Sequence, residues 1–181
     1  MWSRRSDLDT PPPTPDRLHF FNTSLVAMEA VEHTSAFRVP VPAAVVFPLF
    51  SPEGEKAWVP GWDYESPLGT TEMAEDFVFL TRSHAHGAAE AVWLVKRHDP
   101  TAHMVELYKV EPGEKVGMVR VRCRDLPGGE SEVQVRYRYV PLSATGREFV
   151  EGFTHAAFET FIGEWETLLS AHFSASDPPT P

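Results

Sequence analysis

The chain has 181 residues, and its formal net charge at pH 7 is -10. This length suits one domain with a sizeable core, together with tails. The negative charge disfavours a nucleic-acid surface, because such a surface needs clustered Lys and Arg to replace phosphate counterions. It disfavours an anionic membrane face for the same reason, so neither nucleic acid nor a membrane is an expected partner.

The cysteine content and the apolar stretches indicate the cellular location of the protein. Cys123 is the only cysteine, which excludes an internal disulfide and a cysteine-based metal cluster and favours a reducing cytoplasm. The arginines within residues 1–5 are not followed by an apolar run, so no secretory or twin-arginine signal is evident. The longest apolar stretch, residues 39–50, is interrupted by prolines and is too short to cross a bilayer. We expect a soluble cytoplasmic protein without membrane insertion.

Proline-rich segments flank the predicted domain. Residues 1–18 combine closely spaced prolines with serine and charged residues, which predicts a disordered tail. A PxxP-type ligand for an SH3-like module is the alternative reading of this segment. Residues 174–181 contain a Pro-Pro pair that forbids further helix and predicts a second disordered tail. A single domain is therefore expected over residues 19–173.

The domain begins with a strand and two short helices. Residues 36–39 end in apolar-polar alternation and are predicted to form a strand, and an apolar helix is expected over residues 42–50. Ser51 is a predicted N-cap, because a proline at the first helical position and an acid in the first turn follow it. The second helix is expected to run to about Trp58, where a Pro-Gly pair follows.

The middle of the chain has the period-two pattern of strands separated by short turns. The predicted strands span residues 62–66, 76–81, 89–98, 104–110, 115–124 and 130–140. The turn signals between them are His86-Gly87, Asp99-Pro100, Pro112-Gly113 and Pro127-Gly128-Gly129. Connections this short force neighbouring strands to pair antiparallel, so we predict a meander.

Alternation in the last two predicted strands indicates one dry and one wet sheet face. The apolar set is Val119, Val121, Cys123, Val133, Val135, Tyr137 and Tyr139. The polar set is Arg120, Arg122, Arg124, Gln134, Arg136 and Arg138. Because Cys123 belongs to the apolar set, we interpret it as a buried small side chain and not as a nucleophile.

Residues 145–173 are predicted to form one long helix that closes the domain. Thr145 and Glu148 form a capping-box pattern at its start. Its apolar arc consists of Phe149, Val150, Phe153, Ala157, Phe161, Trp165 and Leu168. We expect this helix to cover the dry face of the sheet. Because a twisted antiparallel sheet curls, the helix need not fill the concave side, and the remaining volume could hold a ligand.

Local motifs support a family resemblance. Residues 37–66, FRVPVPAAVVFPLFSPEGEKAWVPGWDYES, contain a strand ending in proline, a helix with an internal Phe, a Ser-Pro-x-x-Glu helix, and Trp58 and Trp62 around a Pro-Gly pair. Together with VWLVKRHDP (residues 92–100) and the closing helix, they resemble the helix-grip fold of the START-like superfamily, also called SRPBCC. This superfamily includes lipid-transfer domains, pollen-allergen-type proteins and polyketide cyclases, and the resemblance covers residues 36–173.

The resemblance implies an α+β fold in which a curved antiparallel sheet wraps around a long C-terminal helix, with two short helices after the first strand. It implies a shared cavity but no fixed catalytic set. The aromatic residues that could line such a cavity offer large contact areas and a few polar tips; ordinary core packing is the alternative. The candidate ligand-binding residues are Trp58, Trp62, Tyr64, Phe79, Trp93, Tyr137, Tyr139, Phe153, Ala157, Phe161 and Glu164.

Glu164 interrupts the apolar arc of the predicted helix. If its carboxylate faced a dry pocket, it would act as an acid or a polar anchor. If it lay at the pocket mouth or a helix edge, it would reach water, and we favour this second reading.

The histidines offer one possible metal site. His84 and His86 form an H-x-H pattern that could chelate zinc with His98 or His103. The first two flank a predicted hairpin tip, which favours solvated loop side chains, so no metal site is predicted. No nucleotide loop or G-x-S-x-G motif is present, and no cofactor is expected.

Three functions remain open at this point. The leading hypothesis is non-covalent binding of a small hydrophobic or aromatic molecule for storage, transport or sensing. The alternative is a cyclase- or aromatase-like enzyme in which Tyr137, Tyr139 or Glu164 moves protons. The third is a protein-interaction module, like the co-chaperone branch of the superfamily, that uses the sheet surface. A homo-oligomer is compatible with the sequence, but nothing in it indicates one.

Overall fold

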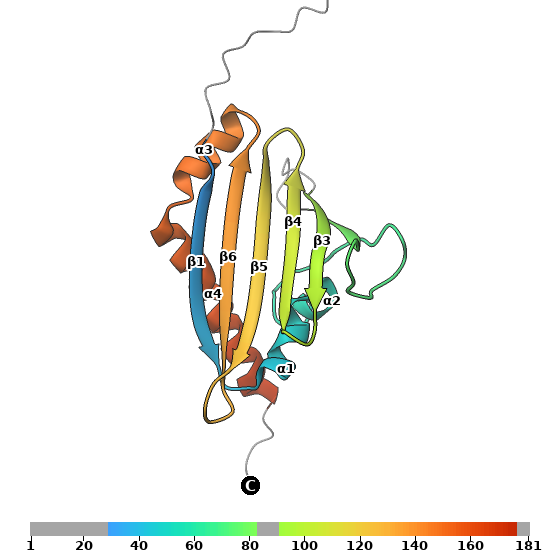
Figure 1. Cartoon of the computed structure of the whole chain (residues 1–181), viewed down its shortest axis with the longest axis vertical. Helices are drawn as coiled ribbons and strands as arrows, with labels where there is room; N and C mark the ends of the chain where they lie inside the picture. The colour runs from blue at the N-terminus through green and yellow to red at the C-terminus, as the bar shows by residue number, and fades with distance from the viewer. Residues whose placement is uncertain (1–28, 83–90, 177–181) are drawn as a thin grey trace, which may run out of the picture.

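Figure 1 shows the computed structural model, which describes residues 29–82 and 91–176. Within these residues, six antiparallel strands form one sheet in the order β1-β6-β5-β4-β3-β2. The strands are β1 (Val31–Val39), β2 (Val78–Thr81), β3 (Ala91–Asp99), β4 (Met104–Glu111), β5 (Lys115–Asp125) and β6 (Ser131–Pro141). The helices are α1 (Ala43–Val46), the 3-10 helix η1 (Phe47–Phe50), α2 (Pro52–Glu55), α3 (Ala144–Gly152) and α4 (His155–Ser176). The predicted α+β class, the short helices after the first strand, the antiparallel meander and a long helix at the C-terminal end are confirmed. The predicted tail over residues 1–18 lies outside the described residues.

The sheet is a meander that β1 extends at one edge. Each strand from β2 to β6 pairs antiparallel with the next, and β1 pairs with β6 from Val31 opposite Tyr139 to Val39 opposite Ser131. The β4–β5 turn needs a left-handed residue, which Gly113 supplies at φ 75°. This closes the hairpin at the predicted Pro-Gly turn.

The two sheet faces differ as the alternation predicts. The members of the apolar set of β5 and β6, including Cys123, are all buried on the concave face. The arginines of the same strands point to the opposite, convex face, where Arg120, Arg122 and Arg124 are each exposed. The prediction of one dry and one wet face is confirmed.

The segment predicted as a strand over residues 62–66 is mostly irregular, so that prediction is wrong. Only Glu65 pairs, through a single bridge to Leu80 in which each residue donates its N–H to the other's carbonyl at 2.9 Å. Pro67 follows at once and has no N–H to continue a ladder. The Trp62 indole instead turns back and donates to the Pro52 carbonyl at 2.8 Å.

The predicted single C-terminal helix is also wrong, because the chain breaks between α3 and α4. Ser143, and not Thr145, caps α3 by accepting from the Gly146 N–H at 3.2 Å. Phe153 leaves the helical region with ψ 64°, and the His33 ring lies 2.8 Å from its carbonyl oxygen through Nε2. Thr154 then caps α4 by accepting from the Ala157 N–H at 3.2 Å. Helix α4 runs to Ser176, beyond the predicted end at residue 173.

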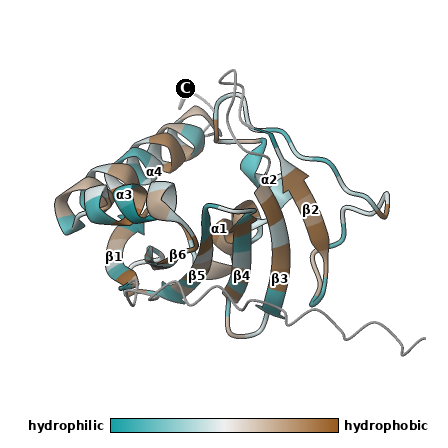
Figure 2. Cartoon of the chain, turned by 90° about the horizontal axis from the view of Figure 1, so that it is seen from above, coloured by the Kyte–Doolittle hydropathy of each residue, from teal (hydrophilic) through white to brown (hydrophobic). Residues whose placement is uncertain are grey.

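The break changes which side chains of α4 face the sheet. Phe158, Ile162 and Leu169 are fully or almost fully buried, whereas Ala157 is exposed. Figure 2 shows α4 over the β1–β6 side of the curled sheet, with α2 on the same concave side beside β3. Helix α1 contacts β5 and β6. None of the described helices is both long and apolar enough to cross a membrane.

Candidate functional site

A small cavity lies in the middle of the concave side, between the sheet, the α2 region and α4. Its volume is about 30 Å³, which is room for about two water-sized groups. It is lined by Phe50, Pro52, Glu55, Trp62, Phe79, Trp93, Leu107, Val119, Val121, Tyr137 and Trp165. Trp62 and Trp165 line it and also keep partial solvent exposure, as do Glu55 and Trp93, so the wall on their side is one side chain thick.

Aromatic rings form most of this wall. Phe79 and Trp93, neighbours on β2 and β3, stack at 5.5 Å with an interplanar angle of 7°. Trp165 meets Tyr137 edge to face at 6.4 Å. The Trp93 indole donates to the Thr81 hydroxyl at 2.9 Å and the Trp62 indole to a backbone carbonyl, so these N–H groups are already satisfied. Both rings therefore offer the cavity apolar surface.

Glu55 brings a carboxyl group into this aromatic wall. It lies on α2, which Ser51 caps through a 3.0 Å bond from the Gly54 N–H. Pro52, three residues earlier on the same helix face, is buried. Gly54 lets α2 pack this closely, because a Cβ there would collide with the Pro48 carbonyl. The local sequence thus turns Glu55 inward.

The Glu55 carboxyl is unpaired in the part of the chain that the structure describes: no hydrogen bond or ion pair joins it to another side chain. Burial raises its pKa from the ordinary 4.5 to about 8, because the charged form loses hydration and gains no partner. At neutral pH the group is therefore mostly a neutral acid.

Tyr137 is the second proton-bearing group of the cavity. It is buried on β6, and its pKa is raised well above 10, first by burial and then by the charges of Tyr139 and Glu55. Its hydroxyl stays neutral throughout the physiological range. Among the residues that line the cavity there is no Lys, Arg or His, so the site holds two neutral acids and no cation.

The predicted ligand-binding residues fall into groups. Trp62, Phe79, Trp93 and Tyr137 line the cavity. Two more lie one layer behind it: Trp58 is buried and packs edge-on against Trp165 at 5.6 Å, and Phe161 meets Tyr137 edge to face at 5.8 Å.

Three predicted aromatic residues lie elsewhere. Tyr139 is buried at the other end of the concave face, where it packs edge to face on Phe149 at 5.0 Å and on Phe153 at 4.9 Å. Tyr64 lies outside the cavity and donates its hydroxyl to Glu53 at 2.9 Å. These rings do not join the cavity wall.

Ala157 and Glu164 are both exposed on α4, so the structure contradicts their placement in the pocket. The reading of Glu164 as a group that reaches water is the correct one. The physical reason is the break before Thr154: α4 starts from its own cap, so its apolar arc does not continue that of α3.

Sequence reasoning missed seven of the residues that line the cavity, including the carboxyl group of Glu55 and the ring of Trp165. Glu55 could have been found from the Ser51 cap, because the fourth helical residue shares a face with Pro52. Trp165 belongs to the predicted apolar arc, but the other residues of that arc have the same helical spacing and apolar character. Only the tertiary packing distinguishes it.

The remaining chemical candidates are structural. Burial raises the pKa of Cys123 to about 12, so its thiol is inert at neutral pH. His98 and His103 pack against the Phe47 ring at 5.7 and 5.8 Å. His84 and His86 lie outside the described residues. Across residues 29–82 and 91–176, no group of three or more His, Cys, Asp and Glu could hold a metal ion.

Comparison with known proteins identifies solved structures that share this architecture. No model of a known protein family matches the chain, and no curated protein matches it in sequence. Among solved structures, norcoclaurine synthase from Thalictrum flavum in complex with dopamine and hydroxybenzaldehyde aligns at a TM-score of 0.61 and 11% identity, covering 83% of this chain and 90% of that one. Ara h 8.0201 aligns at 0.60 and 12%, covering 81% and 99%.

A third similar structure is the di-domain ARO/CYC BexL from the BE-7585A biosynthetic pathway, with a TM-score of 0.60, 13% identity, and coverage of 82% of this chain and 48% of that one. The chain has the START-like helix-grip fold. At these identities the likeness establishes the fold alone. The predicted resemblance is thereby confirmed at the level of the fold.

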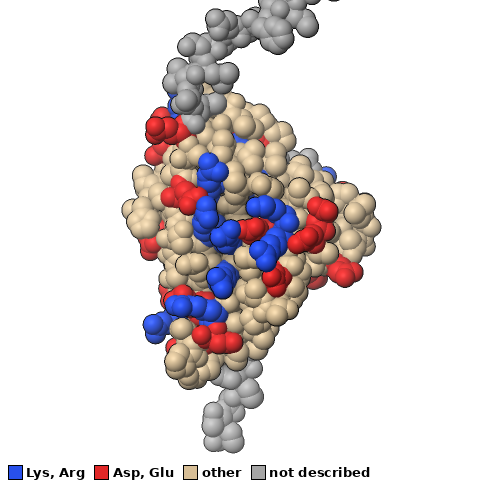
Figure 3. Space-filling model, viewed as in Figure 1, with Lys and Arg blue, Asp and Glu red and all other residues tan. Residues whose placement is uncertain are grey.

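The convex face of this helix-grip sheet is a second distinctive surface. Figure 3 shows Lys and Arg gathered in its centre, although the chain as a whole carries a formal charge of -10. The basic side chains are Arg38, Lys96, Arg120, Arg122, Arg124, Arg136 and Arg138, and the acidic ones among them are Glu32, Glu106 and Glu132.

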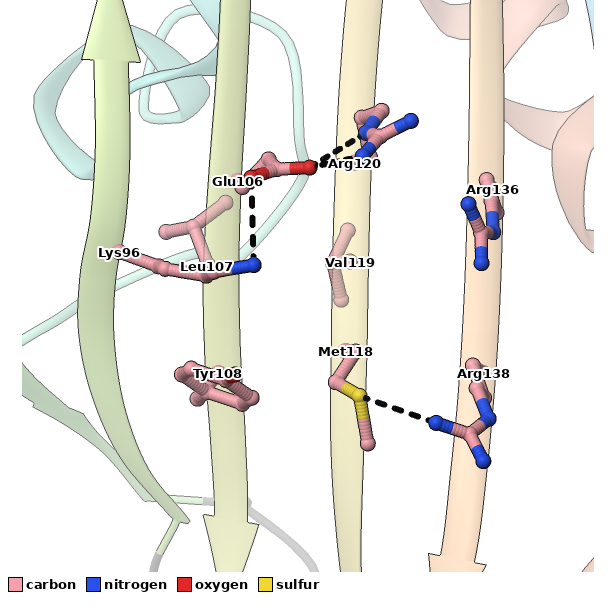
Figure 4. A pocket seen from close by; sticks show the side chains of 9 residues that line it. All are labelled: Lys96, Glu106, Leu107, Tyr108, Met118, Val119, Arg120, Arg136 and Arg138. Carbon is pink, nitrogen blue, oxygen red and sulfur yellow. Dashed lines mark hydrogen bonds and ion pairs between the residues drawn. The ribbon is translucent and has the colours of Figure 1, made fainter. Parts of the chain in front are cut away.

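Most of these convex-face charges are paired across strands. Glu106 accepts from Arg120 at 2.6 Å and lies 3.5 Å from Lys96, around a shallow hollow of about 100 Å³ (Figure 4). Arg136 lies directly opposite Arg120 and donates to Glu32 at 2.6 Å. Arg138 contacts the Met118 sulfur at 3.8 Å. The face is polar and open, unlike the aromatic cavity behind it.

Proposed function

We propose that this helix-grip domain binds a small hydrophobic or aromatic molecule at the aromatic cavity, for storage, transport or sensing. The observation that carries the proposal is the unpaired Glu55 carboxyl within a wall of aromatic rings. The Glu55 side chain is half-buried, so its carboxyl loses part of its hydration without gaining a partner, and a ligand group that bonds it would offset this loss. We place the function in the cytoplasm, where a lone reduced cysteine is stable.

The size of the cavity limits how a ligand enters it. A volume of about 30 Å³ accepts a head group of about two heavy atoms, whereas whole ligands usually occupy about 300–1,000 Å³. The thin wall of Trp62 and Trp165 is where the rest of the molecule would emerge. Binding of a larger molecule therefore requires these two side chains to move.

A cyclase- or aromatase-like enzyme is the second candidate function. The specific observation in its favour is that Glu55 and Tyr137, both proton-bearing, line the same cavity. A carboxylic acid with a pKa of about 8 can donate and accept a proton near neutral pH. This pair replaces the Glu164 of the sequence hypothesis, because Glu164 is exposed.

Two measurements test the binding proposal. Native mass spectrometry of the purified chain should detect a co-purifying small molecule. Ligand-detected NMR with benzyl alcohol and p-cresol should show saturable binding. Val121→Ile adds a methylene to the cavity wall and should weaken binding by about tenfold, since even one extra methylene is felt in a packed interior.

Val135→Ile is the matched control, because Val135 is fully buried on the neighbouring strand but does not line the cavity. It should leave binding unchanged. If the wild-type chain shows no saturable binding, or if both valine variants weaken it equally, the cavity is not the binding site.

A further inference from the structure

We infer that the ligand enters the cavity through a protonated amine head group, which pairs with Glu55. This inference rests on the proposed function and names the chemical class of its ligand. The juxtaposition that carries it is a single unpaired carboxyl group surrounded by the faces and edges of six aromatic rings.

The charged groups around the cavity favour a positively charged ligand over a negatively charged one. Glu55 is the one carboxyl group that lines it, and no cationic side chain of the described residues is present to neutralise it. A ligand carboxylate or phosphate would lose its hydration there without gaining a cation. An ammonium group instead gains a buried ion pair with Glu55. The net charge of -10 also attracts cations to the molecule.

The aromatic wall favours the same class. Aromatic ring faces carry negative partial charge and attract a cation within about 6 Å, most strongly when water is excluded. The wall contains Phe50, Trp62, Phe79, Trp93, Tyr137 and Trp165. The indole N–H groups of Trp62 and Trp93 donate hydrogen bonds within the protein. They are therefore not free to bind an anionic group of the ligand. Rings and carboxyl together form a cage for an organic cation.

The size of the cavity fits a head group of this kind. A volume of about 30 Å³ matches an ammonium nitrogen with one attached carbon. The hydrophobic remainder of the ligand then lies against Trp62 and Trp165, where the wall is thin. A primary amine on a short stem, attached to an aromatic or aliphatic body, meets both requirements.

Pairing with an amine must change the protonation of Glu55. With a pKa of about 8 the free carboxyl is about nine-tenths protonated at pH 7. A nearby cation favours the charged form, so binding an ammonium group expels this proton to solvent. The other titratable group that faces Glu55 in the cavity is Tyr137, whose raised pKa keeps it neutral. Nearly one proton should therefore leave for each amine bound at pH 7.

The test compares three probes of nearly equal shape by isothermal titration calorimetry: benzylamine, benzyl alcohol and benzoate. Repeating each titration in phosphate and in HEPES, which differ in ionisation enthalpy and carry no primary amine, counts the protons released. We expect benzylamine to bind at least about tenfold more tightly than benzyl alcohol, with nearly one proton released at pH 7 and fewer at pH 8, where the free Glu55 carboxyl is already about half ionised. Benzoate should show no saturable binding.

Two variants separate pairing from general electrostatics. Glu55→Gln should remove both the proton release and the preference for benzylamine over benzyl alcohol. Glu53→Gln is the matched control, because Glu53 lies on the same helix but is exposed and pairs with Lys56 at 3.0 Å. It should change neither quantity, and circular dichroism should show that both variants are folded.

The outcomes distinguish the two proposals. If benzyl alcohol binds as tightly as benzylamine, or if benzylamine binds without proton release, the cavity is a site for neutral ligands and the inference is wrong. If none of the three probes binds in a saturable way, the proposed function fails together with the inference. If Glu53→Gln reduces the preference as much as Glu55→Gln, the effect comes from surface charge and the inference also fails.

Discussion

The two faces of the same sheet treat a carboxyl group in opposite ways. On the concave side, Glu55 meets aromatic rings and no cation, and burial raises its pKa to about 8. On the convex side, the two-bond contact of Glu132 with Arg124, at 2.7 and 3.1 Å, lowers the pKa of that carboxyl. Adjacent residues of a strand point to opposite faces, so β6 places Tyr137 in the cavity and Glu132 on the convex face, whereas Glu55 reaches the cavity from α2. The difference shows that the aromatic cavity on the concave side keeps an acid neutral.

The convex face keeps its charges at some cost in stability. Arg120 and Arg136 lie directly opposite each other, and like charges at this spacing repel. Glu106 and Glu32 compensate them one by one. The concave face has no such compensation for Glu55, which is why its neutral form dominates. The following predictions test this contrast, starting with the largest expected effect.

The concave face should contribute far more to stability than the convex face. Phe158→Ala should lower the unfolding free energy by about 3–5 kcal/mol, because the Phe158 ring is fully buried and packs against His33 and Tyr137. Met118→Ala on the half-exposed convex face should lower it by less than about 1 kcal/mol. Urea denaturation measures both, and similar values would contradict the assignment of the core to the concave side.

The acid of the cavity should make the folded state less stable as the pH rises. Unfolded Glu55 ionises near its ordinary pKa of 4.5, whereas the folded group keeps its proton up to about 8. In this window the unfolded state binds fewer protons, so Glu55 lowers the unfolding free energy by at most about 1.4 kcal/mol per pH unit.

Glu55→Gln should remove this decline and stabilise the protein at pH 8. Urea denaturation of both proteins between pH 4 and pH 9 measures the difference. Parallel pH profiles for the variant and the wild-type protein would mean that Glu55 is not held neutral.

A convex-face acid should show the opposite pH dependence. The bond to Arg124 lowers the pKa of Glu132, so its contribution is present above the ordinary pKa and is lost as the pH falls through the folded value. Glu132→Gln should lower the unfolding free energy by about 0.2–1 kcal/mol at pH 7, and the loss should fade below pH 4. A loss that grows on acidification would contradict the pairing.

The smallest expected effect concerns repulsion on the convex face. Arg138 is near Arg136 and has no carboxylate partner in the described part of the chain. Arg138→Gln should raise the unfolding free energy by a few tenths of a kcal/mol at low salt, and the gain should disappear at about 1 M salt, where charges are screened. Arg147→Gln on α3 is the control, and an equal gain there would point to net charge alone.

Much of the fold could be predicted because its signals are local. The alternation from Val119 to Tyr139 is fixed by the period of a strand, and the turn at Gly113 by a backbone conformation that glycine adopts easily. The Ser51 cap specifies α2 in the same way. These features depend on residues close in sequence, so the structure agrees with them.

The failures depend on contacts between distant residues. The break at Phe153 lies against His33, which is 120 positions earlier in the chain, and a helical period alone does not detect such a partner. Ala157 and Glu164 were misplaced for that reason. The six aromatic rings of the cavity come from six separate segments of the chain. Sequence patterns could therefore propose aromatic candidates but could not tell the cavity wall from the rest of the core. Glu55 is the exception, because its inward orientation follows from the local cap.

The interruption between α3 and α4 has a consequence for how the protein can change over evolution. In one continuous helix, each inserted residue would turn every later side chain by about 100° and would carry Trp165 away from the cavity. Here Thr154 starts α4 anew, so the orientation of Trp165 does not depend on the length of α3. Insertions and deletions in α3 can therefore accumulate while the cavity wall stays in place.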